Sequence, residues 1–157
     1  MLRVLQAFEP TFRRALHLYW RLGRGLTLGV RGLVLDKENK VFVVMHTYTP
    51  GWHLPGGGVE PGETLVEALA RELDEEGNIA ILEPPELFGM YLNSRAKRDH
   101  VALFIVRSFR QGRAPAPNME IAAHGFFPVD ALPERTDAST RARIAEVMSG
   151  TSRSEHW

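Results

Sequence analysis

The sequence has no cysteine, no excess charge of either sign and no long apolar run, and each absence excludes a class of protein. Without cysteine, the 157-residue chain can form neither disulfides nor thiolate metal sites, and it has no thiol nucleophile. No apolar run approaches the roughly 20 residues that a transmembrane helix needs, and the N-terminus lacks the apolar core of a secretory signal. We therefore expect a cytoplasmic protein without a transmembrane segment.

The zero net charge is the sum of two segments of opposite sign. Over the whole chain 19 lysines and arginines balance 19 acids, which argues against a stable complex with nucleic acid. Residues 1–31 nevertheless carry six arginines and one acid, whereas residues 57–79 carry seven acids and one arginine. An acidic run is usually a solvated face, so the spacing of these acids has to decide whether they do more.

The chain divides into an accessory helix, one main domain and a tail. Residues 1–25 are the accessory segment, in which an amphipathic helix is expected from about Pro10, a residue that suits the first helical position, to Arg24. We expect its apolar side to pack on the domain or on a second copy in a homodimer; binding to a membrane surface or a polyanion is the alternative. Residues 26–149 form the expected domain, and residues 150–157 a frayed tail.

Within residues 26–149, short apolar runs alternate with turn signals and with two helical patterns. The first two runs, on either side of residues 36–39, have the signature of a β-hairpin. Because strands and helices are mixed in order, the fold class is α/β or α+β around a mixed sheet. The expected strands are Leu26–Leu35, Lys40–Thr47, Glu86–Asn93, Asp99–Arg107 and Ile121–Val129, and the expected helices are Thr64–Glu76 and Asp137–Met148.

The first of these helices has a clear start and a clear core face. Thr64 and Glu67 have the spacing of a capping box, in which each side chain binds the other residue's backbone N–H. Apolar residues recur at steps of three and four, and we expect Val66, Leu69 and Leu73 to face the core.

Three acids of the same helix converge at the edge of its apolar face. Glu72 and Glu76 are four residues apart, and Glu75 lies on the same flank. Like charges at this spacing destabilise a helix, and only Arg71 is close enough in sequence to offset them. Mg²⁺ or Mn²⁺ would supply the missing charge, since both ions prefer carboxylate oxygens. Without cysteine, an all-oxygen metal site is the kind that this chain readily builds.

The loop before the helix is suited to close contact with a ligand. Gly56, Gly57 and Gly58 let the backbone approach a bound group or adopt positive φ. A backbone carbonyl of this turn could therefore complete the coordination shell of a metal ion. Glu63 comes just before the helix, where the helix dipole favours a carboxylate.

Loop and helix together resemble the Nudix box, G-x5-E-x7-R-E-U-x-E-E-x-G-U, where U is a bulky aliphatic residue. One position departs from the pattern, because Asn78 stands where the box has glycine. Asn is the next-best residue for a left-handed helix stop, so we interpret it as a tolerated variant. The matching positions are Gly57, Glu63, Arg71, Glu72, Leu73, Glu75, Glu76 and Ile79.

The resemblance implies a fold and an activity. Nudix domains are α/β/α sandwiches around a mixed β-sheet, and the likeness extends over about residues 26–148, leaving the N-terminal amphipathic helix as an addition. The family typically hydrolyses a pyrophosphate linkage in a nucleoside diphosphate joined to another moiety X. With Mg²⁺ or Mn²⁺ as cofactor, the products would be a nucleoside monophosphate and X-phosphate.

The resemblance also implies roles for single residues. Glu72, Glu75 and Glu76 would hold the metal, and Glu72 would double as the base for the attacking water. The Gly56 carbonyl would be a backbone ligand. Arg71 would orient a glutamate, with Glu75 as the expected partner. Glu63 and Gly57 would hold the metal ligands in position without contacting the metal. Glu120 would be a further acid, contributed by a later loop.

Residues outside the box are weaker candidates. Arg95, Lys97 and Arg98 form a basic loop that would hold substrate phosphates, although basic loops are more often simply solvated. Tyr48 is a candidate for stacking on a base. For Trp52 we expect core packing, and for His53 and His100 structural roles.

The moiety X is not encoded in any secondary signature that we find. A nucleoside triphosphate pyrophosphatase of the MutT type is therefore the alternative activity. A different class is a catalytically silent Nudix-fold protein that binds nucleotides for regulation. The intact set of carboxylates argues against this class, because a retired enzyme is free to lose such charges.

Overall fold

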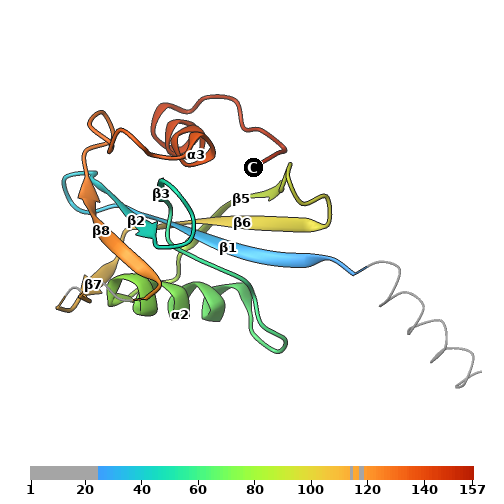
Figure 1. Ribbon diagram of the computed structural model, residues 1–157, viewed down its shortest axis with the longest axis horizontal. Coiled ribbons are helices and arrows are strands. Elements are labelled where there is room, and N and C mark those ends of the chain that lie inside the picture. Colours follow the sequence, from blue (N-terminus) through green and yellow to red (C-terminus); the bar gives the residue numbers. More distant parts are fainter. Residues whose placement is uncertain (1–24, 114, 117–118) are drawn as a thin grey trace, which may run out of the picture.

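The computed structural model describes residues 25–113, 115–116 and 119–157. The predicted N-terminal amphipathic helix lies outside these residues. Two helices enclose a central layer of strands, with α2 on one face and α3 on the other (Figure 1). The predicted α/β/α sandwich is therefore confirmed.

The described elements follow one another in the order expected for a mixed fold. Three short strands, β3, β4 and β7, were not predicted. The strands are β1 (Thr27–Val34), β2 (Val41–His46), β3 (Trp52–His53), β4 (Ile79–Ile81), β5 (Glu86–Leu92), β6 (Asp99–Val106), β7 (Phe109–Gln111) and β8 (Ile121–Phe127); the helices are α2 (Leu65–Gly77) and α3 (Ala138–Ser149).

The strands pair in three groups, with the orders β1-β6-β5, β3-β2-β8 and β4-β7. The parallel pair is β1 with β6, and β5 runs antiparallel to β6, so the pairing is mixed as predicted. The predicted hairpin of β1 and β2 is wrong. The chain turns at residues 36–40, but only the bridge between Leu35 and Val41 joins the two strands, which continue into different sheets.

Strand β1 alternates its side chains between the two helical layers. Val30 and Val34 belong to the apolar cluster that α2 completes with Leu69 and Leu73. Leu33 lies in the second cluster, on the face that α3 covers. Because both faces of the strand layer are covered here, β6 is a continuous buried apolar run from Val101 to Val106.

Helix α2 begins and ends as its sequence predicts. The Thr64 side chain accepts from the Glu67 N–H and the Glu67 carboxylate from the Thr64 N–H, which completes the capping box. Asn78 ends the helix in the left-handed conformation, at φ 49° and ψ 45°, as expected of the variant box position. One prediction for this helix is wrong: Val66 is 42% exposed and does not face the core.

The tail is docked rather than frayed. The Trp157 N–H donates to the Leu92 carbonyl at 2.9 Å, and the Leu92 N–H donates to the Glu155 carbonyl at 2.9 Å. The tail thus runs along the end of β5, where Figure 1 places the C-terminus. Helix α3 has Asp137 as its N-cap and Gly150 as its C-cap.

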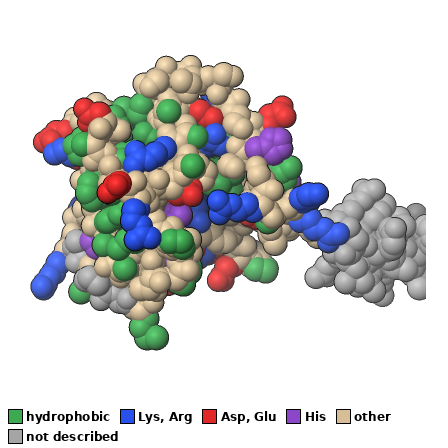
Figure 2. All heavy atoms as spheres, turned by 45° about the horizontal axis from the view of Figure 1, so that its top comes forward, with side chains coloured by type: hydrophobic (Ala, Val, Ile, Leu, Met, Phe, Trp, Pro, Cys, Tyr) green, Lys and Arg blue, Asp and Glu red, His purple; other side chains and the backbone are tan. Residues whose placement is uncertain are grey.

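In the part of the chain that the structure describes, no helix is long and apolar enough to cross a bilayer. On the face drawn in Figure 2, basic and acidic side chains are interspersed and form no continuous patch of one sign.

Candidate active site

The glycine loop is fixed in place because it pairs with the free edge of β1. The Val30 N–H donates to the Gly57 carbonyl at 2.9 Å, and the Val59 N–H donates to the Leu28 carbonyl at 2.8 Å. Gly56 has φ 135°, a conformation that only glycine adopts readily, and a Cβ there would lie 3.0 Å from the Arg31 Cα. The loop therefore lies directly against β1 and beside α2.

A cavity of about 300 Å³ opens between this loop and the acidic flank of α2. Its lining combines carboxylates, the glycine loop and four basic or aromatic residues from elsewhere in the chain. The lining residues are Arg31, His46, Tyr48, Thr49, His53, Gly56, Gly57, Gly58, Glu72, Glu76 and Glu120.

Glu76 is the most deeply buried acid of this cavity, with 4% of the residue exposed. Its carboxylate accepts from the Gly56 N–H at 2.8 Å and lies 2.7 Å from the His46 Nε2. His46, the last residue of β2, is itself buried. A buried carboxylate is stable only with such partners, so Glu76 ties the helix to both the loop and β2.

Glu72 lies one turn earlier and rests on the glycine loop. A Cβ at Gly57 would lie only 2.6 Å from the Glu72 carboxyl carbon, so the missing side chain makes room for the carboxylate. Burial raises the pKa of Glu72, and the negative charge of Glu76 raises it further, while Arg71 opposes both effects. Glu72 thus lies in a partly desolvated site in which its negative charge is disfavoured.

Arg71 contacts the expected partner, Glu75, but holds Glu72 and Glu63 more closely. Its Nε donates to Glu63 at 2.9 Å and its Nη1 donates to Glu72 at 2.8 Å. The contact with Glu75 is longer, at 3.5 Å, and the Glu75 side chain is 60% exposed. Arg71 also donates to the Gly58 carbonyl at 3.0 Å, which joins helix and loop. Bonding to Arg71 lowers the pKa of Glu63.

Glu120 approaches the cavity from the loop before β8. The Thr47 N–H donates to the Glu120 carbonyl at 2.9 Å, which places this loop beside the end of β2. The Tyr48 hydroxyl donates to the Glu120 carboxylate at 3.2 Å. Tyr48 and Glu120, two predicted site residues from outside α2, thus line the cavity together with Glu72 and Glu76 of α2.

The structure does not bring the predicted basic loop to this site. Arg95, Lys97 and Arg98 lie in the exposed turn between β5 and β6, and none of them lines the cavity. Trp52 does not line it either: as predicted, its ring packs in the core, edge-on to Phe127 with 5.2 Å between the ring centroids.

Arg31, His46 and His53 line the cavity although the motif does not contain them. Arg31 donates to the Leu54 carbonyl at 3.1 Å and to the Gly56 carbonyl. The sequence did indicate a special role for Arg31, because an arginine in the middle of an apolar strand is unusual and needs a hydrogen-bond partner. Burial lowers the pKa of His53, whose Nε2 lies 3.0 Å from the Pro50 carbonyl.

The donor atoms fit a hard divalent cation. Carboxylates of Glu72, Glu76 and Glu120 share the cavity with backbone oxygens, the ligand type that Mg²⁺ and Mn²⁺ prefer. The Gly56 carbonyl, one predicted ligand, also accepts from the Arg31 guanidinium, and a carbonyl oxygen keeps a second lone pair for a metal ion. Among the described residues, no three histidine, aspartate or glutamate side chains lie close enough together to coordinate one metal ion without rearrangement.

Comparison with known proteins identifies the family. The NUDIX domain model matches residues 25–147. A "MutT-like protein" of Streptomyces ambofaciens is 29% identical over 124 residues, which cover 79% of this chain and 78% of that protein. A Bacillus subtilis (strain 168) protein named "Putative 8-oxo-dGTP diphosphatase" is 32% identical over 115 residues, covering 69% of this chain and 74% of the relative.

A solved structure confirms the fold. The crystal structure of a MutT NUDIX hydrolase from Burkholderia pseudomallei superposes with a TM-score of 0.67 at 24% identity, covering 78% of this chain and 98% of that one. The box residues, the α/β/α layers and the family model agree, and the chain belongs to the NUDIX family of hydrolases.

Proposed function

We propose that the protein hydrolyses, with Mg²⁺ or Mn²⁺, a pyrophosphate linkage in a nucleoside diphosphate joined to another moiety X. The products would be a nucleoside monophosphate and X-phosphate. The observation that carries this proposal is the pair Glu72 and Glu76, two buried or half-buried carboxylates that face one cavity against a glycine loop. Such a pair costs stability unless a bound group offsets its charge.

Four groups would hold the cation: the carboxylates of Glu72, Glu76 and Glu120 and the carbonyl of Gly56. When bound, a divalent ion neutralises phosphate charge and lowers the pKa of water. Glu75, at the exposed edge of the same flank, would contribute from the solvent side.

Glu72 is the residue that we assign as the general base. Its raised pKa makes the carboxylate a better proton acceptor than an ordinary glutamate. Arg71 fixes the carboxylate through a 2.8 Å hydrogen bond, and Glu63 in turn fixes Arg71. The proton of the attacking water would pass to Glu72, while Glu76 stays in place through His46 and Gly56.

A nucleoside triphosphate pyrophosphatase is the second candidate. The names of the Streptomyces and Bacillus relatives favour it, since both describe MutT-like or 8-oxo-dGTP chemistry. Both candidates break the same kind of bond, so the substrate and not the mechanism distinguishes them.

A panel of nucleoside diphosphate derivatives and triphosphates, incubated with Mg²⁺ and analysed by chromatography, tests the proposal. We expect turnover of at least one member, dependent on the metal. No turnover of any member, together with equal nucleotide binding by wild type and Glu76→Gln, would instead indicate a binding protein.

We also propose a cytoplasmic location and a homodimer formed through residues 1–25. The chain's lack of cysteine supports the first proposal, and the amphipathic sequence of residues 1–25 supports the second. Light scattering at micromolar concentration tests the dimer, and a monomeric mass would refute it.

A further inference from the structure

The one departure from the Nudix box stands at the junction between α2 and the next strand. Asn78 replaces the glycine of the pattern, and it ends α2 in the left-handed conformation, at φ 49°. Strand β4 starts at the following residue and pairs with β7, so Ile79 lies opposite Gln111. The end of α2 therefore lies beside the residues that follow β7.

The Asn78 side chain binds the chain just after β7. Its Nδ2 donates to the Arg113 carbonyl at 2.8 Å, and the Asn78 backbone carbonyl accepts from the Gly112 N–H at 2.9 Å. A glycine at position 78 would keep the second bond and lose the first, because only a side chain reaches Arg113. Asparagine thus adds a bond between α2 and the connection from β7 to β8.

Gly112 makes room for this asparagine. A Cβ at Gly112 would lie 2.6 Å from the Asn78 Nδ2 and 3.0 Å from its Cγ, closer than side chains normally approach one another. Gly112 is not among the described glycines with positive φ, so its backbone conformation does not itself favour glycine. What the absent side chain provides at position 112 is therefore space for the Asn78 amide.

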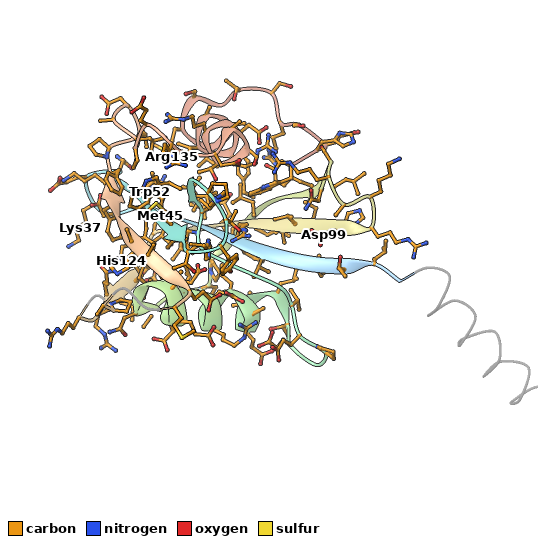
Figure 3. All side chains as sticks on the ribbon, in the orientation of Figure 1. Lys37, Met45, Trp52, Asp99, His124 and Arg135 are labelled. Atoms are coloured by element: carbon orange, nitrogen blue, oxygen red, sulfur yellow. The ribbon has the colours of Figure 1, made fainter. Side chains whose placement is uncertain are left out.

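The same connection carries Glu120 to the cavity, and two further side chains hold it. The Nε2 of His124, labelled on β8 in Figure 3, lies 2.8 Å from the Pro115 carbonyl. The Thr47 hydroxyl, just past the end of β2, donates to the Met119 carbonyl at 2.6 Å. The described residues of this connection, 112–113, 115–116 and 119–120, are thus held by α2 first, by β8 next and by the end of β2 last.

We propose that Asn78 is a positioning residue, whose bond to Arg113 fixes the start of the connection that places the Glu120 carboxylate in the cavity. This inference rests on the proposed function, in which Glu120 is a ligand of the cation. Fixing a loop in advance reduces the conformational entropy that its ligand residue gives up on binding. Asn78 itself does not line the cavity, so it acts on the cation only through other residues.

Asn78→Gly tests this role because it restores the glycine of the box. Glycine adopts the left-handed conformation more readily than asparagine, so the stop of α2 is retained. We expect the affinity for Mn²⁺, measured by calorimetric titration without substrate, to fall by about 2- to 10-fold, the range of one net hydrogen bond. An affinity equal to that of wild type, or higher, would overturn the proposal.

Asn39→Gly is the matched control. Asn39 is the other non-glycine residue with positive φ in the part of the chain that the structure describes, at 57°. Its side chain accepts from the Arg107 guanidinium at 3.2 Å, and it does not line the cavity. The affinity for Mn²⁺ should be that of wild type. An equal fall in both variants would show a general effect of glycine and contradict a positioning role for Asn78.

A double-mutant cycle shows whether Asn78 acts through Glu120. Glu120→Gln removes the carboxylate, so adding Asn78→Gly to this variant should leave the affinity for Mn²⁺ unchanged. If Asn78→Gly lowers the affinity by the same factor with and without the carboxylate, the two residues act independently and the proposal is wrong.

Hydrogen exchange separates this proposal from the proposed function, because it needs neither metal nor substrate. The Thr47 N–H donates to the Glu120 carbonyl at 2.9 Å, so its exchange rate reports how often this end of the connection detaches. We expect Asn78→Gly and Gly112→Ala each to speed this exchange by about 2- to 10-fold, and the double variant to exchange no faster than either. This result would support the role of Asn78 even if wild type hydrolyses nothing, whereas a wild-type rate in Asn78→Gly would refute it even if wild type is active.

Discussion

Gly57 shows how much of the site depends on one missing side chain. A Cβ at this position would lie 2.6 Å from the Glu72 carboxyl carbon, closer than real contacts allow. We therefore expect Gly57→Ala to push Glu72 away from Arg71 and to lower kcat by about 10- to 100-fold, the range of a misplaced catalytic group.

Gly58→Ala is the matched variant for stability. A Cβ at Gly58 would meet no atom within 4 Å. Thermal unfolding should show a lower midpoint for Gly57→Ala and an unchanged midpoint for Gly58→Ala. Equal midpoints for Gly57→Ala and wild type, with unchanged kcat, would show that Glu72 does not need this space.

The acids of the site could be predicted residue by residue, but the basic groups could not. Glu72 and Glu76 share a helix, so their common face follows from a spacing of four. Arg31 and His46 come from β1 and β2, and only tertiary structure brings them to the same cavity. The bond between Arg71 and Glu63 was not predicted for a related reason, since Glu63 reaches Arg71 from the loop before the helix.

Helix α2 carries the site, and its start can be tested on its own. The Thr64 hydroxyl accepts from the Glu67 N–H at 3.2 Å, and the Glu67 carboxylate accepts from the Thr64 N–H at 2.8 Å. Replacing a threonine cap with alanine typically costs about 0.5–2 kcal/mol. We expect Thr64→Ala to lower the free energy of unfolding in urea by about 1 kcal/mol.

Thr64→Ser is the conservative counterpart because it keeps the accepting hydroxyl. It should unfold at nearly the wild-type urea concentration. If both substitutions cost the same, the capping hydroxyl contributes nothing and the lost methyl group accounts for the change.

The contact between β5 and α3 predicts a pH dependence. The Tyr91 hydroxyl donates to Glu146 at 2.9 Å, and burial raises the pKa of Tyr91 to about 12. In the unfolded chain tyrosine loses its proton near pH 10. The unfolded state therefore binds fewer protons between about pH 10 and 12, so Tyr91 makes the folded state lose stability as pH rises through this window.

Tyr91→Phe removes the titrating group. Its unfolding midpoint should fall less steeply above pH 10 than that of wild type, although it is less stable at pH 8 because Glu146 loses a donor. Parallel curves for the two proteins in this alkaline range would contradict the assignment of Tyr91.

At the level of elements, local patterns were reliable and pairings were not. Both ends of α2 and the cap of α3 agree with the sequence because caps are local. The turn at residues 36–40 has the sequence of a hairpin turn. The parallel partner of β1 is β6, which lies more than 60 residues away, so no local sequence pattern indicates this pairing. The docking of the tail was not predicted either, because it depends on Arg143 and Glu146 of α3, the helix that precedes the tail.

In the whole molecule, the strand layer positions one acidic helix beside one glycine loop, and the cavity between them follows from that placement. Net charge says nothing about the ligand if, as we propose, the acids engage a phosphate through a cation. The central claim is therefore that hydrolysis requires the cation and the buried acids of α2 together.

Hydrolysis by wild type, Glu76→Gln and Asp74→Asn, each with Mg²⁺ and with a chelator, tests this claim most directly. Asp74 is the matched control, since it is an exposed acid on the same helix that does not line the cavity. We predict metal-dependent turnover by wild type and Asp74→Asn, and a loss of at least about 100-fold in kcat for Glu76→Gln. Turnover that persists in the chelator, or equal rates for Glu76→Gln and wild type, would contradict the account.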